Sequence, residues 1–575
     1  MAQGGVLEAR NRRRYERRRG YRRRRHRRRL LTHALPVAIL AAAAFAAGVV
    51  LATEQGQAER QLVRRYVTDW EHRDYARMYG MLDRSSRARI SETAFARQLS
   101  GATATATMRS LRLVRLGSLR GSTYTVRVRV STRLWGRLVE TLSVPLAGSG
   151  STARVHFAGE LLFPGLRPGE RLHRHITLPP RAALLASDGT PLAQGPGRTS
   201  PIPDVAGQIV GTLGPIPSTE AAAYVARGYP ATIQVGLDGL ERIFQDRLAG
   251  QIGGTLLAGR RALATIPAVG AGPVQTTIDP AMERAAVQAL GGQYAGIAVM
   301  NPHTGALEAL AGIAFSDLQP PGSTMKIITS TAALQAGIVT LQSTFPVASG
   351  AVINGYTLHN ANGESCGGTL LNAFAVSCNS VFAPLGARVG ARALVATADR
   401  FGFNQPSSIA GAAESTIPAA GQIGDALAVG SSAIGQGLVQ TTPLEMTDVA
   451  ATIAMGGRRP IPTLLAHQPP RFVRVTTPRV AREVQQMMEA VVQFGTGTAA
   501  QIPGVVVAGK TGTAEIQTAT NPNVSNPKNT DAWFVGYAPA GHPKIVGGAL
   551  FPDQGAGGTA AAPAVRAVLA AALGR

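Results

Sequence analysis

The chain begins with a block of arginines that runs directly into an uncharged apolar segment. Residues 1–29 hold fourteen arginines against two glutamates, and residues 30–53 carry no formal charge and consist mostly of Ala, Val, Leu and Ile. A helix of this length is sufficient to cross a bilayer, and the positive-inside rule places the arginines in the cytoplasm. The sequence therefore predicts a basic cytoplasmic tail (1–29), a single transmembrane helix (30–53) in the cytoplasmic membrane, and an extracytoplasmic catalytic domain.

Two alternatives apply to this first segment. The small residues at 42–47 resemble a signal-peptide cleavage site, so the sequence leaves open whether the anchor is cleaved. The formal net charge of +25 is typical of nucleic-acid binding, but an arginine block beside an apolar helix is explained by topology and anionic lipid. We therefore expect a membrane partner and no nucleic acid.

Two periodicities characterise residues 54–162. Leu62, Tyr66 and Trp70 recur at helical spacing, whereas Tyr124 to Val130 alternate between apolar and polar residues, as half-buried strands do. The pattern predicts a small α+β domain in which helices precede a curved, cone-like sheet.

The rest of the chain falls into two parts that differ in composition and periodicity. Glycine and proline punctuate residues 163–272, where only 236–248 reads as a convincing helix, and we predict an extended linking module. From 273 to 575 strand-like and helical segments alternate over about 300 residues, which is enough for one enzyme domain. The predicted fold class is multidomain α+β with a C-terminal α/β domain.

Only two cysteines occur, Cys366 and Cys378, both on the predicted outer side, where disulfides persist. Their spacing matches no zinc motif, and the histidines form no HExxH pattern. The sequence predicts no metal and no cofactor, and it leaves open whether the two cysteines are bridged.

The first chemical motif is Ser323-Thr-Met-Lys326, which follows Pro321-Gly322 and precedes an apolar helical run. Proline marks a helix start, so we expect Ser323 in the first turn with Lys326 one turn later, in contact with it. A lysine that loses its proton can activate a serine, which arginine cannot do. Ser525 and Lys528 match the same pattern, but Pro527 lies between them in a loop-like stretch.

Two further motifs follow. Ser377-Cys378-Asn379 is the only S-x-N in the chain, and Lys510-Thr511-Gly512-Thr513 follows a β-branched run, Val505 to Val507, that predicts the end of a strand. Gly512 allows another backbone to approach closely. Residues 504–511 also match the phosphate-binding P-loop, but their variable positions are Val-Val-Val-Ala and no helix opening follows. The strand interpretation is preferred.

In this order the S-x-x-K, S-x-N and K-T-G motifs resemble the active-site set of penicillin-binding proteins and serine β-lactamases. The segments 236–242, 435–446 and 533–539 resemble the class B, monofunctional branch, and the likeness covers roughly residues 165–575. It implies a linking and dimerisation module over 163–272 and a β-lactamase-like transpeptidase domain over 273–575. Residues 54–162 resemble the nuclear-transport-factor-type domain of some members, and residues 181–189 depart from the usual start of the module.

The resemblance implies a peptidoglycan D,D-transpeptidase that acts on D-Ala-D-Ala stem peptides through a serine acyl-enzyme. Each motif residue then receives a role. These are Ser323 as the nucleophile, Lys326 as its base, Ser377 as a proton relay, Asn379 as the group that orients Lys326 and the substrate amide, and a charged Lys510 with Thr511, Gly512 and Thr513 as the substrate-binding strand.

The alternatives share the acylation step. A β-lactamase or D,D-carboxypeptidase would hydrolyse the same acyl-enzyme, and a non-enzymatic β-lactam sensor would only signal through it. The anchor and the extra domains favour a wall synthase. β-Lactams are expected inhibitors, and because the sequence contains no glycosyltransferase signature, a separate glycan polymerase is an expected partner.

Overall fold

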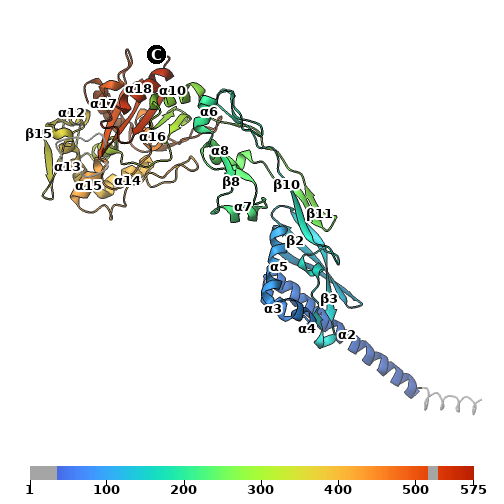
Figure 1. Ribbon diagram of the computed structural model, residues 1–575. Helices are drawn as coiled ribbons and strands as arrows, with labels where there is room; N and C mark the ends of the chain where they lie inside the picture. The colour runs from blue at the N-terminus through green and yellow to red at the C-terminus, as the bar shows by residue number, and fades with distance from the viewer. Residues whose placement is uncertain (1–34, 516–528) are drawn as a thin grey trace, which may run out of the picture. The chain divides into compact units, whose positions relative to one another are not determined.

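The computed structural model describes residues 35–515 and 529–575, which form two compact units (Figure 1). The first unit comprises residues 1–178, 218–231 and 252–268, and the second comprises 179–217, 232–251 and 269–575. Residues 163–272, predicted as a linking module, therefore contribute to both units.

The first unit contains the predicted helices and strands. Val63, Tyr66 and Trp70 on the first helix are almost fully buried, and they pack with Phe95 against a four-stranded antiparallel sheet in the order β1-β2-β3-β4. The helices are α2 (Leu35–Glu71), α3 (Tyr75–Gly80), α4 (Arg84–Arg89), α5 (Glu92–Thr105) and α7 (Ala221–Arg227). The strands are β1 (Met108–Arg120), β2 (Thr123–Thr132), β3 (Arg137–Ala147) and β4 (Arg154–Val155), with a second sheet of β5 (Leu172–Thr177), β10 (Gly253–Ala258) and β11 (Arg261–Ile266).

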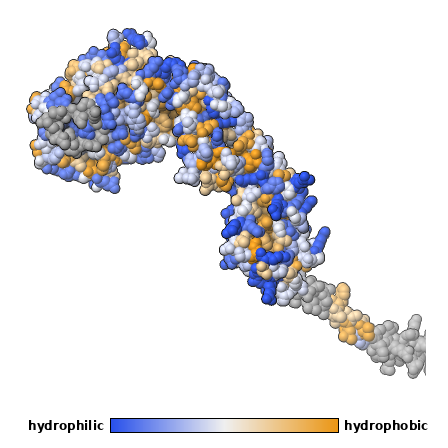
Figure 2. Space-filling model, in the orientation of Figure 1, coloured by the Kyte–Doolittle hydropathy of each residue, from blue (hydrophilic) through white to orange (hydrophobic). Residues whose placement is uncertain are grey.

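The N-terminal part of α2 is apolar and exposed. Val37, Ile39, Leu40 and Phe45 are each more than half exposed, and Figure 2 shows this stretch in the hydrophobic colour. Within the described residues no single helix is both long and apolar enough to span a bilayer, and by length and composition only a bent pair of helices, 379–389 with 391–401, would pass. The tail at 1–29 and residues 30–34 of the predicted anchor lie outside the described residues.

The predicted helix over 236–248 is wrong in its extent. Gly236 ends strand β9, and two short helices follow, α8 (Gly239–Ile243) and α9 (Gln245–Leu248). Gly239 has a φ of 54°, and a Cβ there would lie 2.6 Å from the carbonyl oxygen of Ile209. Such close packing in a left-handed conformation requires glycine and delays the start of the helix.

A buried carboxylate holds the start of the segment 181–189. Glu241 is fully buried, and its two oxygens accept from Arg181 Nε and Arg198 Nε, each at 2.6 Å. Arg198 also donates to the carbonyl oxygen of Ala182. Arg181 thus fixes the start of this segment to helix α8.

Glu241→Gln is expected to reduce the free energy of unfolding of the second unit by about 3 kcal/mol, because it leaves two buried guanidiniums without a countercharge. Asp204→Asn is the matched control, since the Asp204–Arg284 pair has the same kind of contact at 2.7 Å but lies at the surface, where a pair is worth less than about 1 kcal/mol. Denaturant unfolding of both variants measures the difference. Equal losses would contradict this account of the buried network.

The second unit is built around a five-stranded antiparallel sheet in the order β14-β13-β23-β22-β21. Successive side chains of a strand point to opposite faces, so Trp533, Val535 and Tyr537 of β22 join one core and Phe534 joins the other. Helices α10 and α18 cover the Phe534 face, and α16 covers the opposite one. The alternation of helical and strand-like segments predicted after residue 273 is confirmed at its start, where a helix over 280–290 is followed by strands over 296–300 and 307–312.

The elements of this unit have the following bounds. Helices are α6 (Pro203–Ile209), α10 (Pro280–Leu290), α11 (Lys326–Gln335), α12 (Leu370–Ala375), α13 (Asn379–Val389), α14 (Ala391–Phe401), α15 (Ala426–Ala433), α16 (Pro443–Ala454), α17 (Pro478–Gln493) and α18 (Ala561–Ala572), with a 3-10 turn η4 (Gly322–Met325). The sheet strands are β13 (Gly296–Met300), β14 (Leu307–Gly312), β21 (Ala508–Glu515), β22 (Thr530–Ala538) and β23 (Ile545–Phe551). Short strands are β6 (Leu184–Leu185), β7 (Pro191–Ala193), β8 (Leu213–Pro215), β9 (Gln234–Gly236), β12 (Val274–Gln275), β15 (Thr344–Ala348), β16 (Gly350–Ile353), β17 (Tyr356–His359), β18 (Cys366–Thr369), β19 (Arg458–Pro460) and β20 (Phe472–Arg474).

Candidate active site

Three segments that are distant in sequence meet beside the edge strand β21. Glycines let η4 reach this strand: a Cβ on Gly322 would lie 2.8 Å from the carbonyl oxygen of Thr513, and a Cβ on Gly512 would lie 2.8 Å from that of Pro321. Ser323 and Thr513 are therefore brought together, and both are half-buried. The junction between α12 and α13 supplies the third segment.

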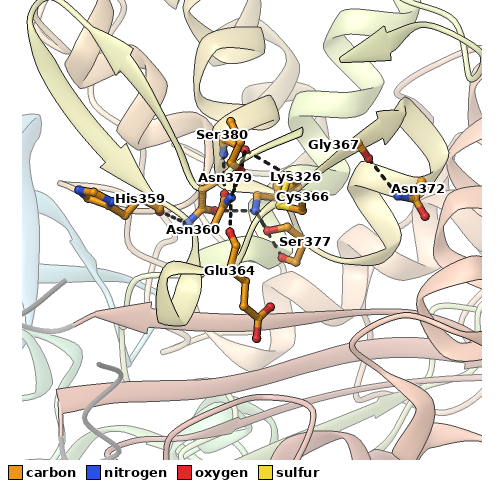
Figure 3. The surroundings of a disulfide bond; sticks show 12 residues. Lys326, His359, Asn360, Glu364, Cys366, Gly367, Asn372, Ser377, Asn379 and Ser380 are labelled. Atoms are coloured by element: carbon orange, nitrogen blue, oxygen red, sulfur yellow. Dashed lines mark hydrogen bonds between the residues drawn. A yellow bond between two sulfur atoms is a disulfide. The ribbon is translucent and has the colours of Figure 1, made fainter. Parts of the chain in front are cut away.

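Lys326 is anchored to the S-x-N turn. Its Nζ donates to the carbonyl oxygen of Ser377 and to Oδ1 of Asn379, both at 2.7 Å (Figure 3). Asn379 is itself oriented, since its Nδ2 donates to the carbonyl oxygen of His359 at 3.1 Å. These two acceptors satisfy both protons of a neutral amine, so its lone pair remains free to take a further proton.

Ser377 Oγ lies between the two lysines of the site. It is 3.3 Å from Lys326 Nζ and accepts from Lys510 Nζ at 2.9 Å. Lys510 Nζ also donates to the carbonyl oxygen of Thr511 at 2.9 Å, and the Thr511 hydroxyl lies 2.5 Å from that of Thr496. A hydroxyl placed between two amines can carry a proton from one to the other.

Burial controls the charge of both amines. Lys326 and Lys510 are fully buried, and burial, followed by the charge of Lys510, lowers the pKa of Lys326 well below its usual range. Burial lowers the pKa of Lys510 to about 7. The rings of Phe382 and Phe374 lie 5.5 Å from the respective Nζ atoms, and although they favour the charged forms, desolvation is the larger effect.

The turn that carries Ser377 has an unfavourable backbone conformation, and contacts with neighbouring segments hold it in place. Ser377 has a φ of 60°, which is unfavourable for a residue with a side chain and persists only where surrounding contacts impose it. Cys378 is disulfide-bonded to Cys366, so the open question about the cysteines is answered, and the bridge fastens the turn to strand β18 (Figure 3).

The side chain of Asn360 provides a second link to this region, next to the disulfide. Its Oδ1 accepts from the Ser380 N–H at 2.7 Å, and its Nδ2 lies 2.8 Å from the carbonyl oxygens of Ala348 and Glu364. The side chain is almost fully buried. It therefore links the loop after β17 to the first turn of α13, next to Asn379.

Asn360→Ala is expected to slow acylation by penicillin about tenfold and to destabilise the second unit, because several buried polar groups lose their partners. Asn354→Ala is the matched control: Asn354 lies in the same hairpin, and its exposed amide makes one bond to Asp425. Stopped-flow acylation and thermal unfolding separate the two effects. An acylation rate that is unchanged in Asn360→Ala would contradict a positioning role.

The structure brings the predicted site residues together, with two corrections. Ser323 and Lys326 are one turn apart as predicted, but no hydrogen bond joins Ser323 Oγ to Lys326 Nζ, because the amine is directed to Ser377 and Asn379 instead. The strand predicted to end in the run Val505 to Val507 instead begins at Ala508. Lys510 and Thr511 therefore lie inside β21 rather than at the start of a helix, which also disagrees with the P-loop alternative. Ser525 and Lys528 lie outside the described residues.

Sequence reasoning missed several residues of the site. Asn360, Phe374, Phe382 and Thr496 surround the motifs but lie in no short pattern that identifies them. Only the apolar spacing of Phe374 and Phe382 offered a signal, and that spacing is equally typical of ordinary core residues.

Two segments of the chain match known protein families. Residues 295–570 match the penicillin binding protein transpeptidase domain, and residues 179–261 match the penicillin-binding protein dimerisation domain.

Individual relatives agree with these matches. The chain is 39% identical over 290 residues to the peptidoglycan D,D-transpeptidase PbpA of Mycolicibacterium smegmatis, a match that covers 45% of this chain and 56% of the relative. The chain thus spans little more than half the length of the curated relatives it matches. The crystal structure of PBPA from Mycobacterium tuberculosis is 28% identical, with a TM-score of 0.56, over 68% of this chain and 99% of that one. The ceftriaxone acyl-enzyme complex of the same protein is 27% identical, with a TM-score of 0.56, over 68% and 98%.

Proposed function

Because the chain belongs to the penicillin-binding protein family, we propose that it is a peptidoglycan D,D-transpeptidase that forms an acyl-enzyme on Ser323. The observation that carries the proposal is the position of Ser377 Oγ between the two buried amines, 3.3 Å from Lys326 Nζ and 2.9 Å from Lys510 Nζ. This arrangement supplies a neutral base, a proton relay and a second cation beside one half-buried serine.

In the acylation step, Ser323 Oγ bonds to the carbonyl carbon of the penultimate D-alanine while its proton passes to Lys326 Nζ. The C–N bond to the terminal D-alanine then breaks, and the leaving nitrogen takes a proton through Ser377 Oγ. An ester and free D-alanine result. An amine of a second stem peptide then bonds to the ester carbonyl carbon and gives a proton to Lys326. The C–O bond to Ser323 breaks, the Ser323 oxygen takes the proton from Lys326, and the amide-linked product leaves.

Strand β21 is proposed to hold the substrate. Lys510 and the hydroxyls of Thr511 and Thr513 bind its terminal carboxylate, and a bound carboxylate raises the pKa of Lys510 by adding an opposite charge. Because β21 lies at the edge of its sheet, an extended peptide can pair with it. The backbone N–H groups of Ser323 and Thr513 are proposed as the oxyanion hole, in which one donor is typically worth about 3 kcal/mol.

Transfer and hydrolysis are distinguished by the acceptor. The protein is incubated with a D-Ala-D-Ala pentapeptide and increasing amounts of a second peptide with a free side-chain amine, and products are separated by mass. A transpeptidase gives an amide-linked dimer whose share of the products rises with the acceptor. A carboxypeptidase gives only the shortened peptide acid at every acceptor concentration, and a β-lactamase or a sensor gives no peptide product.

The remaining assignments are also proposals. A single helix over 30–53 would anchor the chain, with residues after 54 outside the cytoplasm, and the Cys366–Cys378 disulfide supports an oxidising compartment. Residues 54–162 would form a nuclear-transport-factor-type domain, which the helix-before-sheet order supports. A separate polymerase would supply the glycan strands. β-Lactams would acylate Ser323, by analogy with the ceftriaxone acyl-enzyme complex of the relative.

A further inference from the structure

The outer face of the first unit's sheet carries arginines in direct opposition. Residues 108–147 contain eight arginines and one acidic residue, Glu140. In the strand register Arg112 of β1 lies opposite Arg129 of β2, and Arg115 lies opposite Arg127. Like charges at such positions destabilise a sheet, so the pattern has a cost to folding.

These four side chains and Arg137 of β3 form one surface, here called the arginine face. All five are exposed, and Arg137 lies opposite Ser131, on the next rung of the sheet (β2 and β3 are labelled in Figure 1). Among the residues that the structure describes, only Arg112 approaches a carboxylate, with Glu71 at 3.9 Å. Glu140 does not neutralise the face, because it is paired with the buried Val128 and so lies on the inner side.

We propose that the arginine face binds a linear phosphodiester polymer that lacks bases, such as a polyol phosphate chain. Guanidinium groups bind phosphate oxygens through two parallel hydrogen bonds. The face extends over three rungs, about 13 Å along the strands, whereas a single phosphate is satisfied by one or two guanidiniums. Binding of a polyanion offsets the mutual repulsion of the opposed arginines.

Other anionic partners fit less well. Single-stranded nucleic acid binds through aromatic side chains on which bases stack. The other residues in these cross-strand rows are Ser110, Ser131, Val139 and Thr141, none of which is aromatic. Lipid headgroups lie at the wrong height if the anchor is membrane-embedded. The predicted anchor ends at Thr53, and Arg112 lies at the level of Glu71, 18 residues or about 27 Å further along α2.

The test uses the full-length protein in detergent and a fluorescently end-labelled polyglycerol phosphate, with binding followed by anisotropy. The logarithm of the affinity is expected to fall with the logarithm of salt concentration with a slope of about −3, as for several neutralised phosphates. The double variant Arg127→Glu, Arg129→Glu should bind about 30-fold more weakly or worse. Its new glutamates face Arg115 and Arg112, so its melting temperature should be unchanged or higher.

The matched control is Arg64→Glu, Arg65→Glu, which makes the same charge change on exposed positions of α2 and should bind like the native protein. Penicillin acylation should be unchanged in both variants, which separates this surface from the catalytic site. Equal affinity of the two double variants would overturn the proposal. Tighter binding of a single-stranded oligonucleotide, of polyglutamate, or of phosphatidylglycerol vesicles than of polyglycerol phosphate would also overturn it.

Discussion

Ser323→Ala is expected to abolish covalent labelling by penicillin, with a fall in the acylation rate constant of about 10⁴-fold or more. Ser323 is the half-buried hydroxyl that η4 places beside Thr513 of β21. No other hydroxyl of the candidate site is both accessible to a substrate and next to the proposed base and oxyanion donors. The measurement is the time course of labelling with a fluorescent penicillin.

Two variants make this result specific. Ser330→Ala lies on α11, one helix turn beyond Lys326, where the hydroxyl is buried and has no hydrogen-bond partner, and it should label at the native rate. Ser377→Ala should label slowly rather than not at all, because it removes only the relay. Labelling that survives in Ser323→Ala but is lost in Ser377→Ala would assign the nucleophile to Ser377 instead.

Lys326→Arg is expected to lower the acylation rate by about 10²- to 10⁴-fold, the usual contribution of a general base. Arginine keeps the positive charge but does not release its proton at any working pH. Lys544→Arg, at an exposed position of the same unit, is the control and should acylate normally. A native rate in Lys326→Arg would contradict the assignment of the base.

The pH profile of native acylation tests the same pair of amines. The base must be neutral, so the rate rises with pH as Lys326 loses its proton at its lowered pKa. The substrate-binding cation must be charged, so the rate falls as pH rises through the pKa of Lys510 at about 7, or above it once a carboxylate is bound. The expected profile is bell-shaped, and Lys326→Arg should lose the acidic limb.

The parts of the site that were predicted from sequence are those encoded in short, local patterns. Ser323, Lys326, Ser377, Asn379 and Lys510 lie in motifs whose residue types the chemistry requires, and strands with clear alternation, such as β2, were predicted with nearly correct bounds. The prediction of a helix over 236–248 was wrong in its extent, because the close approach of Gly239 to Ile209 delays the start of the helix. Its residues have suitable spacing, but tertiary packing decides the outcome.

What remained hidden depends on contacts between distant segments. The resemblance assigned Asn379 to orienting Lys326, but the missing hydrogen bond between Lys326 and Ser323 follows from where α13 begins. Asn360 acts through a bond to Ser380 twenty residues away. Neither follows from propensity or spacing. The opposed arginines were equally invisible, because a high arginine content does not reveal which strand positions face each other.

The most direct test of the central claim is to locate the acyl group. The full-length protein is treated with benzylpenicillin, digested, and its peptides sequenced by mass spectrometry after minutes and after hours. The account predicts a single penicilloyl adduct on Ser323 that persists over hours, as an ester protected from water. An adduct on any other residue, or none while the protein remains folded, would contradict it.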